Sequence, residues 1–211
     1  MASRDDVSFY KDLLHKRVVD CEGRAVGDLL DLAANPADGP SSTPAIQHLV
    51  IRLHRASATT PVAGPAKSLI LSWEMVDAVE PGCIRLRRAW TDLAPSSLAA
   101  GQILLRRQIM DQQVVDCRGL KLQRVNDIAM GFSDGALHLW GMDTGIQGFL
   151  TRLGYRWGLL ALLRPVYRRL SRHVIQWDFV DRVEPARGRI RLRLSRDEVR
   201  SAVRRAPEST V

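Results

Sequence analysis

The sequence predicts a mainly β protein: two small β-barrels in tandem, the second carrying an inserted amphipathic helical segment. Three observations support this fold class. One stretch of sequence occurs twice, short alternating segments are separated by Gly, Pro and Asp turns, and one basic apolar segment occurs only in the second copy. A chain of 211 residues is long enough for one domain or two, and the repeat favours two.

The repeat consists of two matched pairs in the same order. Residues 18–32 read VVDCEGRAVGDLLDL and residues 114–128 read VVDCRGLKLQRVNDI, while WEMVDAVEP at 73–81 matches WDFVDRVEP at 177–185. The two stretches of the second pair lie farther apart in the chain than the two stretches of the first pair, so the second copy contains an insertion. A repeat of about 100 residues suits a small domain rather than one unit of a solenoid. We therefore expect a barrel at 9–90, a linker at 91–102, a second barrel at 103–195 with the insertion at 146–172, and a tail at 196–211.

The first copy begins with a short lead-in at 9–14, which we expect to form one helical turn. Strands are then predicted on either side of the turn DCEG, in which Asp can bond the backbone and Gly permits positive φ. Pro- and Gly-rich loops and alternation of apolar and polar residues place the remaining strands of this copy. The predicted strands are 17–20, 25–32, 46–55, 68–73 and 83–88.

The second copy repeats this order around the turn DCRG. Strands are expected within 103–130 and at 135–145, 173–180 and 188–194, and the tail should begin as a helical turn or two. Trp73 and Trp177 occupy the same position of the repeat, so we expect them to pack in the two cores. A ligand-stacking role is the alternative.

The insertion at 146–172 is the main difference between the copies. Its apolar residues recur at spacings of three and four, which predicts a helical face, and Pro165 should end or kink the helix. The segment is basic and has no acidic residue. Such a segment can cover a barrel end, contact a partner or lie on an anionic membrane. The residues predicted to make a partner or membrane contact are Arg152, Arg156, Trp157, Arg164, Arg168 and Arg169.

The formal charge of +8 favours anionic partners: nucleic acid, a membrane face or an acidic protein. No apolar run is long enough for a transmembrane helix, and the N-terminus lacks the features of a signal peptide. Three scattered cysteines indicate a reducing compartment. We therefore expect a cytoplasmic protein, at the inner face of the membrane if the insertion or its partner lies there.

No catalytic, cofactor-binding or metal-binding residue is predicted. The five histidines lack metal-ligand spacing, and neither a nucleophile motif nor a phosphate-binding loop occurs. Four repeated carboxylates, at Asp20, Asp31, Asp116 and Asp127, could together bind Mg²⁺. Since each falls at a turn or strand end, local bonding to the backbone is the favoured interpretation. We expect no enzyme activity and no cofactor.

The segments LLHKRVVDCEGRAVGDLLDL and LLRRQIMDQQVVDCRGLKLQRVNDI resemble the opening motif of the PRC-barrel (photosynthetic reaction centre barrel) family. The resemblance extends over roughly 9–194. Within the family, DQQVVD, RVNDI and VIQWDFVDRVEP are most similar to the tandem barrels that precede the N-terminal domain of MgtE-type magnesium transporters. Two positions depart from the pattern, because His15 and Gln123 stand where the family has glycine.

The resemblance implies a non-catalytic interaction or regulatory module that docks on a protein partner, such as a magnesium transporter or its regulator. The transporter-linked helical domain and the CBS domains are not expected within these residues, so a magnesium-sensing role does not carry over. The alternative is an RNA- or ribosome-associated maturation factor of RimM-like type. Residues 187–196 are basic at alternating positions, which suits a phosphate backbone, although ordinary exposure of a strand explains the pattern equally well.

Overall fold

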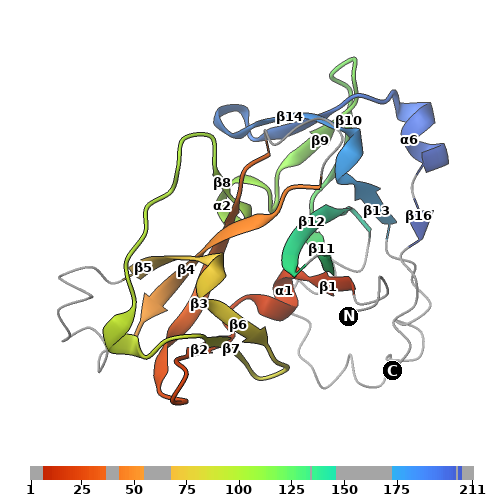
Figure 1. The fold of residues 1–211 in the computed structure, drawn as a ribbon. Helices are drawn as coiled ribbons and strands as arrows, with labels where there is room; N and C mark the ends of the chain where they lie inside the picture. The colour runs from red at the N-terminus through yellow and green to blue at the C-terminus, as the bar shows by residue number, and fades with distance from the viewer. Residues whose placement is uncertain are drawn as a thin grey trace. The chain divides into compact units, whose positions relative to one another are not determined.

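The structure is a computed structural model that describes residues 7–36, 43–54, 68–133, 135–145, 173–202 and 204–205 (Figure 1). Over these residues the protein is mainly β, with several sheets and short helices. The chain forms two compact units. The N-terminal unit comprises Lys11–Asp38 and Pro44–Arg107, and the C-terminal unit comprises Met1–Tyr10, Gly39–Thr43 and Gln108–Val211.

The N-terminal unit is built on one sheet with the strand order β5-β4-β3-β2-β7-β6, and β8 pairs with β3. Strands β2 and β7 run parallel, and the other pairs are antiparallel. In chain order the elements are α1 (Tyr10–Leu13), β2 (Arg17–Val19), β3 (Ala25–Ala34), β4 (Ile46–Leu53), β5 (Ser68–Ser72), the 3₁₀ helix η1 (Trp73–Met75), β6 (Val76–Val79), β7 (Cys83–Leu86), the 3₁₀ helix η2 (Trp90–Asp92), β8 (Ile103–Leu104) and α2 (Leu105–Gln108).

The C-terminal unit contains two sheets, one with the order β1-β11-β12-β13-β16 and one with the order β10-β9-β15-β14. In the second of these, β15 runs parallel to β9. The elements are β1 (Val7–Phe9), β9 (Gln113–Val115), β10 (Lys121–Arg124), β11 (Asp127–Ser133), β12 (Ala136–Asp143), β13 (His173–Gln176), η3 (Trp177–Phe179), β14 (Val180–Glu184), η4 (Pro185–Arg187), β15 (Arg189–Leu192), α6 (Arg196–Ala202) and β16 (Arg204–Arg205).

Both units follow the same path of strands. Strand β3 of the first copy corresponds to two strands of the second copy, β10 and β11, which are separated by residues 125–126. In each unit a 3₁₀ turn beginning at the repeated tryptophan joins two strands: η1 connects the edge strands β5 and β6, and η3 connects β13 of one sheet to β14 of the other. Among the described residues, however, no sheet closes into a barrel through backbone pairing. The predicted β class is therefore confirmed, and the closed tandem barrels are not.

The two copies differ at the repeat position that holds Gly27 in the first copy and Gln123 in the second. Gly27 pairs with Leu53 of β4, and a Cβ atom on Gly27 would overlap the carbonyl group of Arg52. Only glycine permits so close an approach of two strands. In the second copy β12 ends at Asp143, which pairs with Asp127, so within the described residues β12 does not extend to Gln123. Among the described residues, a strand approaches this position so closely only in the first copy.

The lead-in segments take positions that the sequence did not reveal. The predicted helical turn is present as α1, but it is preceded by β1, which pairs with β11 of the second copy. The lead-in of the second copy contains β8, which pairs with β3 of the first. Each unit thus includes a lead-in strand from the other sequence copy. Periodicity within a segment cannot indicate such an exchange, because it carries no information about the pairing partner.

The cores consist of the apolar residues on the inner faces of these strands, including Leu29, Leu49 and Ile84 in one unit and Ile128, Leu139 and Ile190 in the other. Trp73 and Trp177 are buried at equivalent positions, as predicted. His15 and Asp111, where the lead-ins end, have φ values of 64° and 66°. Glycine adopts this left-handed conformation more readily than any other residue.

Candidate functional site

Asp20, the carboxylate of the first repeated turn, is buried and bonded to the backbone. It accepts the N–H groups of Glu22 at 3.0 Å and Arg24 at 2.9 Å, while Gly23 completes the turn with φ of 81°. It also accepts the buried N–H of Trp90 at 3.1 Å. Burial alone would raise the pKa of Asp20, but these donors and the Arg24 guanidinium together lower it below its ordinary value. Asp20 therefore connects the turn to η2.

Asp116 repeats the local part of this arrangement. Its carboxylate is buried and accepts the N–H groups of Arg118 at 2.9 Å and Leu120 at 2.8 Å. Asp31 and Asp127 form a second repeated pair at the point where the lead-in strands arrive, and each accepts the N–H of the residue that follows it. All four repeated carboxylates thus hold backbone groups, which is the interpretation that the sequence favoured.

The described part of the chain contains no group of three or more His, Cys, Asp or Glu side chains that could hold a metal ion. Cys21 and Cys117 are exposed in their turns, and both are free thiols. The six residues predicted to contact a partner or a membrane, Arg152, Arg156, Trp157, Arg164, Arg168 and Arg169, lie outside the described residues. Within the part of the chain that is described, no helix is long and apolar enough to cross a bilayer.

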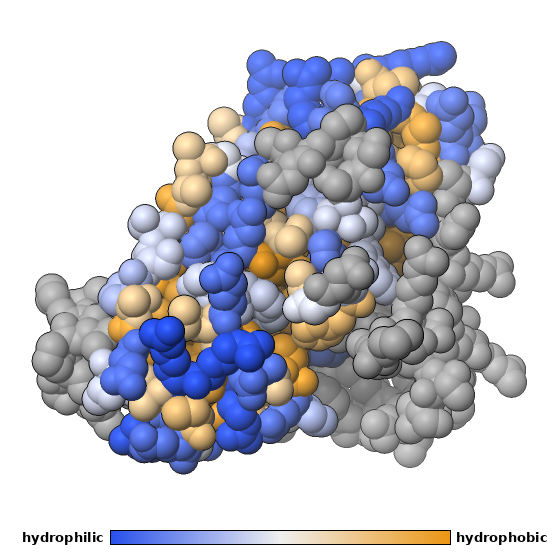
Figure 2. Space-filling model, in the orientation of Figure 1, coloured by the Kyte–Doolittle hydropathy of each residue, from blue (hydrophilic) through white to orange (hydrophobic). Residues whose placement is uncertain are grey.

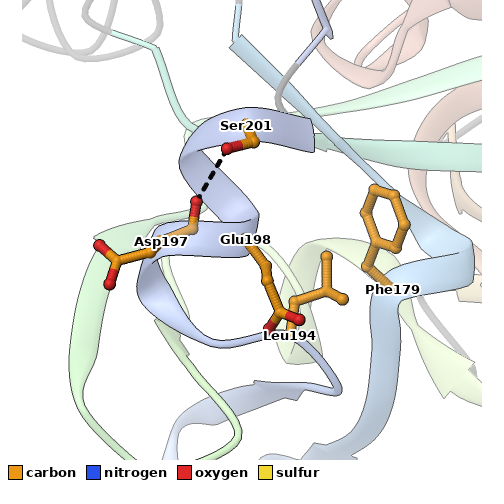
Figure 3. A pocket seen from close by; sticks show the side chains of 5 residues that line it. All are labelled: Phe179, Leu194, Asp197, Glu198 and Ser201. Atoms are coloured by element: carbon orange, nitrogen blue, oxygen red, sulfur yellow. Dashed lines mark hydrogen bonds between the residues drawn. The ribbon is translucent and has the colours of Figure 1, made fainter.

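A depression of about 550 Å³, open to solvent, lies beside α6 (Figure 3). Its lining residues are Phe179, Leu194, Asp197, Glu198 and Ser201. The Ser201 hydroxyl donates to the backbone carbonyl of Asp197 at 3.2 Å, and the Glu198 carboxylate accepts from the N–H of Ser195 at 2.7 Å, as in a helix-capping box. The polar groups here satisfy the helix, and no histidine or lysine is among the described residues that line the depression.

The outer face of the sheet β10-β9-β15-β14 carries several basic side chains. Ile190 and Leu192 of β15 are buried, while Arg189 and Arg191 alternate with them and point outward. Side chains of directly paired residues share a face of a sheet. Two rows therefore cross this face: Arg124, Gln113, Arg189 and Glu184 in one, and Lys121, Val115, Arg191 and Arg182 in the other.

We call Lys121, Arg124, Arg182, Arg189 and Arg191 the basic face. Hydrophilic residues gather over β14 and β10 at the top of Figure 2. Val115 lies between Lys121 and Arg191 in its row but is only 2% exposed. Long basic side chains can cover such an apolar residue with their methylene stems while their charged ends stay in water. The face therefore presents charge over an apolar base.

The N-terminal unit supplies an internal comparison. The register of its sheet places Asp28, Arg17, Cys83 and Glu80 at the positions of the first row, and Ala25, Val19, Arg85 and Ala78 at those of the second. The five basic residues of the C-terminal unit are thus replaced by Asp28, Cys83, Ala25, Arg85 and Ala78. The same framework carries balanced charge in one unit and a strong positive excess in the other.

The ion pairs of the two units also differ. In the N-terminal unit, Arg85 donates to both oxygens of Glu80, with Nε to Oε1 at 3.1 Å and Nη2 to Oε2 at 3.4 Å. In the C-terminal unit the equivalent carboxylate, Glu184, pairs with Arg189 at 2.5 Å instead. The hydrogen bond from Arg189 lowers the pKa of Glu184, so this carboxylate is ionised at neutral pH.

Arg191, the structural equivalent of Arg85, forms no ion pair with the described residues. Its Nη1 lies 3.4 Å from the carbonyl oxygen of Cys117, and its buried Nε has no hydrogen-bond acceptor. Lys121 and Arg124 likewise form no salt bridge within the described ranges, whereas Arg182 contacts its neighbour Asp181 at 3.1 Å. Cationic hydrogen-bond donors are therefore left available at the centre and one edge of the basic face.

Sequence reasoning recognised the alternating arginines of 187–196 but not the complete face. The other cations come from β10 and β14, which sequence inspection treated separately. Comparing the charge of the two copies would have found them: residues 113–124 and 180–193 hold eight basic and three acidic residues, while the matched residues 17–28 and 76–87 hold four basic and five acidic ones. Searches against protein-family models and curated proteins gave no match.

Proposed function

We propose that this protein is a non-catalytic docking module that binds a protein partner through the basic face. One observation carries the proposal. The side chains that the two copies share hold the turns and the cores, whereas the outer faces of the matched sheets differ in charge. The two copies keep the same framework, but only the C-terminal unit has a basic outer face. Such a face is suited to the recognition of an anionic surface.

The resemblance to PRC-barrels adds an expected domain architecture and a class of partner to this proposal. In the N-terminal unit η1 joins the two edge strands β5 and β6, and in the C-terminal unit η3 joins the two sheets, which supports barrel-like units even without backbone closure. The resemblance of the sequence to tandem PRC-barrels suggests a partner in divalent metal-ion, particularly magnesium, transport. A membrane transporter as partner would hold the module at the inner face of the membrane, in the cytoplasm.

The second candidate function is that of an RNA- or ribosome-associated factor. Arg189, Arg191 and Arg193 stand at every second position through β15 and the residue that follows it, and arginine is well suited to phosphate. This pattern concerns a single strand, however. The two described rows of this face include the carboxylate of Glu184 and no aromatic side chain, and stacking aromatics are typical of single-strand nucleic-acid sites.

Photocrosslinking in cells tests the proposal. A photoreactive amino acid replaces Arg124 on the basic face, and in a matched control it replaces Asp28, the equivalent position of the N-terminal unit. We expect a discrete protein adduct from position 124 and not from position 28. An adduct destroyed by ribonuclease would favour the RNA candidate. Equal labelling from both positions, or none from position 124, would contradict docking through this face.

A further inference from the structure

We propose that Arg191 is the specificity-determining residue of the basic face and that it receives a carboxylate from an acidic segment of the partner protein. The inference rests on the proposed docking function and names the partner's chemistry and the residue that recognises it. It comes from the comparison of Arg191 with Arg85, which occupies the same register position in the other unit.

The N-terminal unit shows the geometry of a satisfied site. Arg85 presents Nε and Nη2 to the two oxygens of Glu80, the forked arrangement in which a guanidinium binds a carboxylate. Val19, beside Arg85 in the row, corresponds to Val115, beside Arg191. Both arginines thus stand on equivalent strands next to the same apolar residue, and in only one of the units is the carboxylate supplied from within.

The C-terminal unit lacks that carboxylate because of one substitution. Cys83 in the first copy corresponds to Arg189 in the second, and Arg189 forms an ion pair with Glu184. Glu184 also has Arg182 and Arg187 within 3.8 Å. Three arginines therefore lie close to one carboxylate, and within the described residues Arg191 forms no ion pair or hydrogen bond with a carboxylate, although its charge contributes to lowering the pKa of Glu184.

The present conformation of Arg191 favours capture of an incoming carboxylate. Its Nε is shielded from water and has no acceptor among the residues that the structure describes, which is an unfavourable state for a charged donor. Its contact with the Cys117 carbonyl is long, at 3.4 Å. Turning the guanidinium toward a carboxylate replaces one weak hydrogen bond with two strong ones, so little is lost when the side chain moves.

The neighbouring charges favour a polypeptide over a nucleic acid. Lys121 and Arg124 lie on β10, two strands away from Arg191, and can contact further acidic side chains of the same segment. Glu184 remains on the face and would repel a continuous phosphate backbone. A polypeptide can present its carboxylates at intervals and place neutral residues opposite Glu184.

The test measures binding of a fluorescein-labelled oligoglutamate peptide to the whole protein by fluorescence anisotropy at about 0.15 M salt. Arg191→Lys keeps the charge but removes the fork, and we expect it to weaken binding about tenfold. Arg85→Lys is the matched control, because Arg85 is already engaged with Glu80, and its affinity should equal that of the wild type. An oligouridylate of equal length serves as the competing ligand and should bind more weakly.

Each alternative result refutes a part of the inference. Wild-type affinity in Arg191→Lys would show that charge alone matters, and absence of oligoglutamate binding would remove the acidic polypeptide as ligand. Tighter binding of oligouridylate, with the same dependence on Arg191, would assign the face to nucleic acid. A protein adduct from position 124 together with an unaffected Arg191→Lys variant would retain the docking function while refuting this inference.

Discussion

Replacement of Asp20 by alanine should destabilise the protein more than the same replacement of its repeat partner, Asp116. Both carboxylates hold two N–H groups of an exposed turn, but Asp20 also accepts the buried N–H of Trp90. The turn groups can bond to water once the carboxylate is removed, so their loss costs about 1 kcal/mol in each variant. A buried donor without an acceptor costs about 1–3 kcal/mol more. We expect losses of about 2–4 kcal/mol for Asp20→Ala and about 1 kcal/mol for Asp116→Ala.

The pH dependence provides a second measure of the same contacts. The pKa of Asp20 is lowered in the folded protein, so its contribution is fully present above the pKa of an unfolded aspartate, about 3.9. That contribution is lost as the pH falls through the folded-state pKa. The difference in unfolding free energy between wild type and Asp20→Ala should therefore be largest at neutral pH and should shrink below about pH 4.

Urea unfolding followed by circular dichroism gives both quantities, provided that the slope of the free energy against urea is unchanged. Asp20→Asn keeps the shape of the side chain but does not ionise, so its stability should depend less on pH than that of the wild type. Equal losses in the two alanine variants would mean that the Trp90 contact contributes nothing. A wild-type advantage that persists unchanged at pH 3 would refute the role of the ionised carboxylate.

Two further predictions concern the backbone. Gly27→Ala should destabilise the protein by at least about 2 kcal/mol, because the added methyl group overlaps the backbone of β4. Gln123→Ala, at the equivalent exposed position, should change the stability by less than about 0.5 kcal/mol. Similar urea midpoints for the two variants would refute the argument that only Gly27 permits the close approach of β4. His15→Gly should stabilise by about 0.5–1 kcal/mol, since relief of the left-handed strain exceeds the entropy cost of glycine. A lower thermal midpoint for His15→Gly would contradict that account. The same change at Asp111 should help less, because aspartate tolerates this conformation better than most residues.

Some features of this protein follow from local sequence alone. The D-x-x-G turns, the strands around them, the burial of Trp73 and Trp177 and the backbone role of the four repeated aspartates could all be predicted. Each depends on a residue and its near neighbours, since a glycine at positive φ or an alternating strand is defined within a few positions. The repeat added a second copy of every such signal.

Other features were decided only when distant segments met. The exchange of lead-in strands depends on which sheet edge accepts β1 and β8, and the contact of Asp20 with Trp90 joins residues far apart in the chain. The basic face likewise combines two hairpins, and its cations lie in common rows only because β15 pairs with β9 in one register. A shift of that register by one residue would turn Arg189 and Arg191 toward the core. The composition gives the protein its charge of +8. The pairing of the strands determines where part of that charge lies, and it leaves Arg191 without the paired carboxylate that Arg85 has.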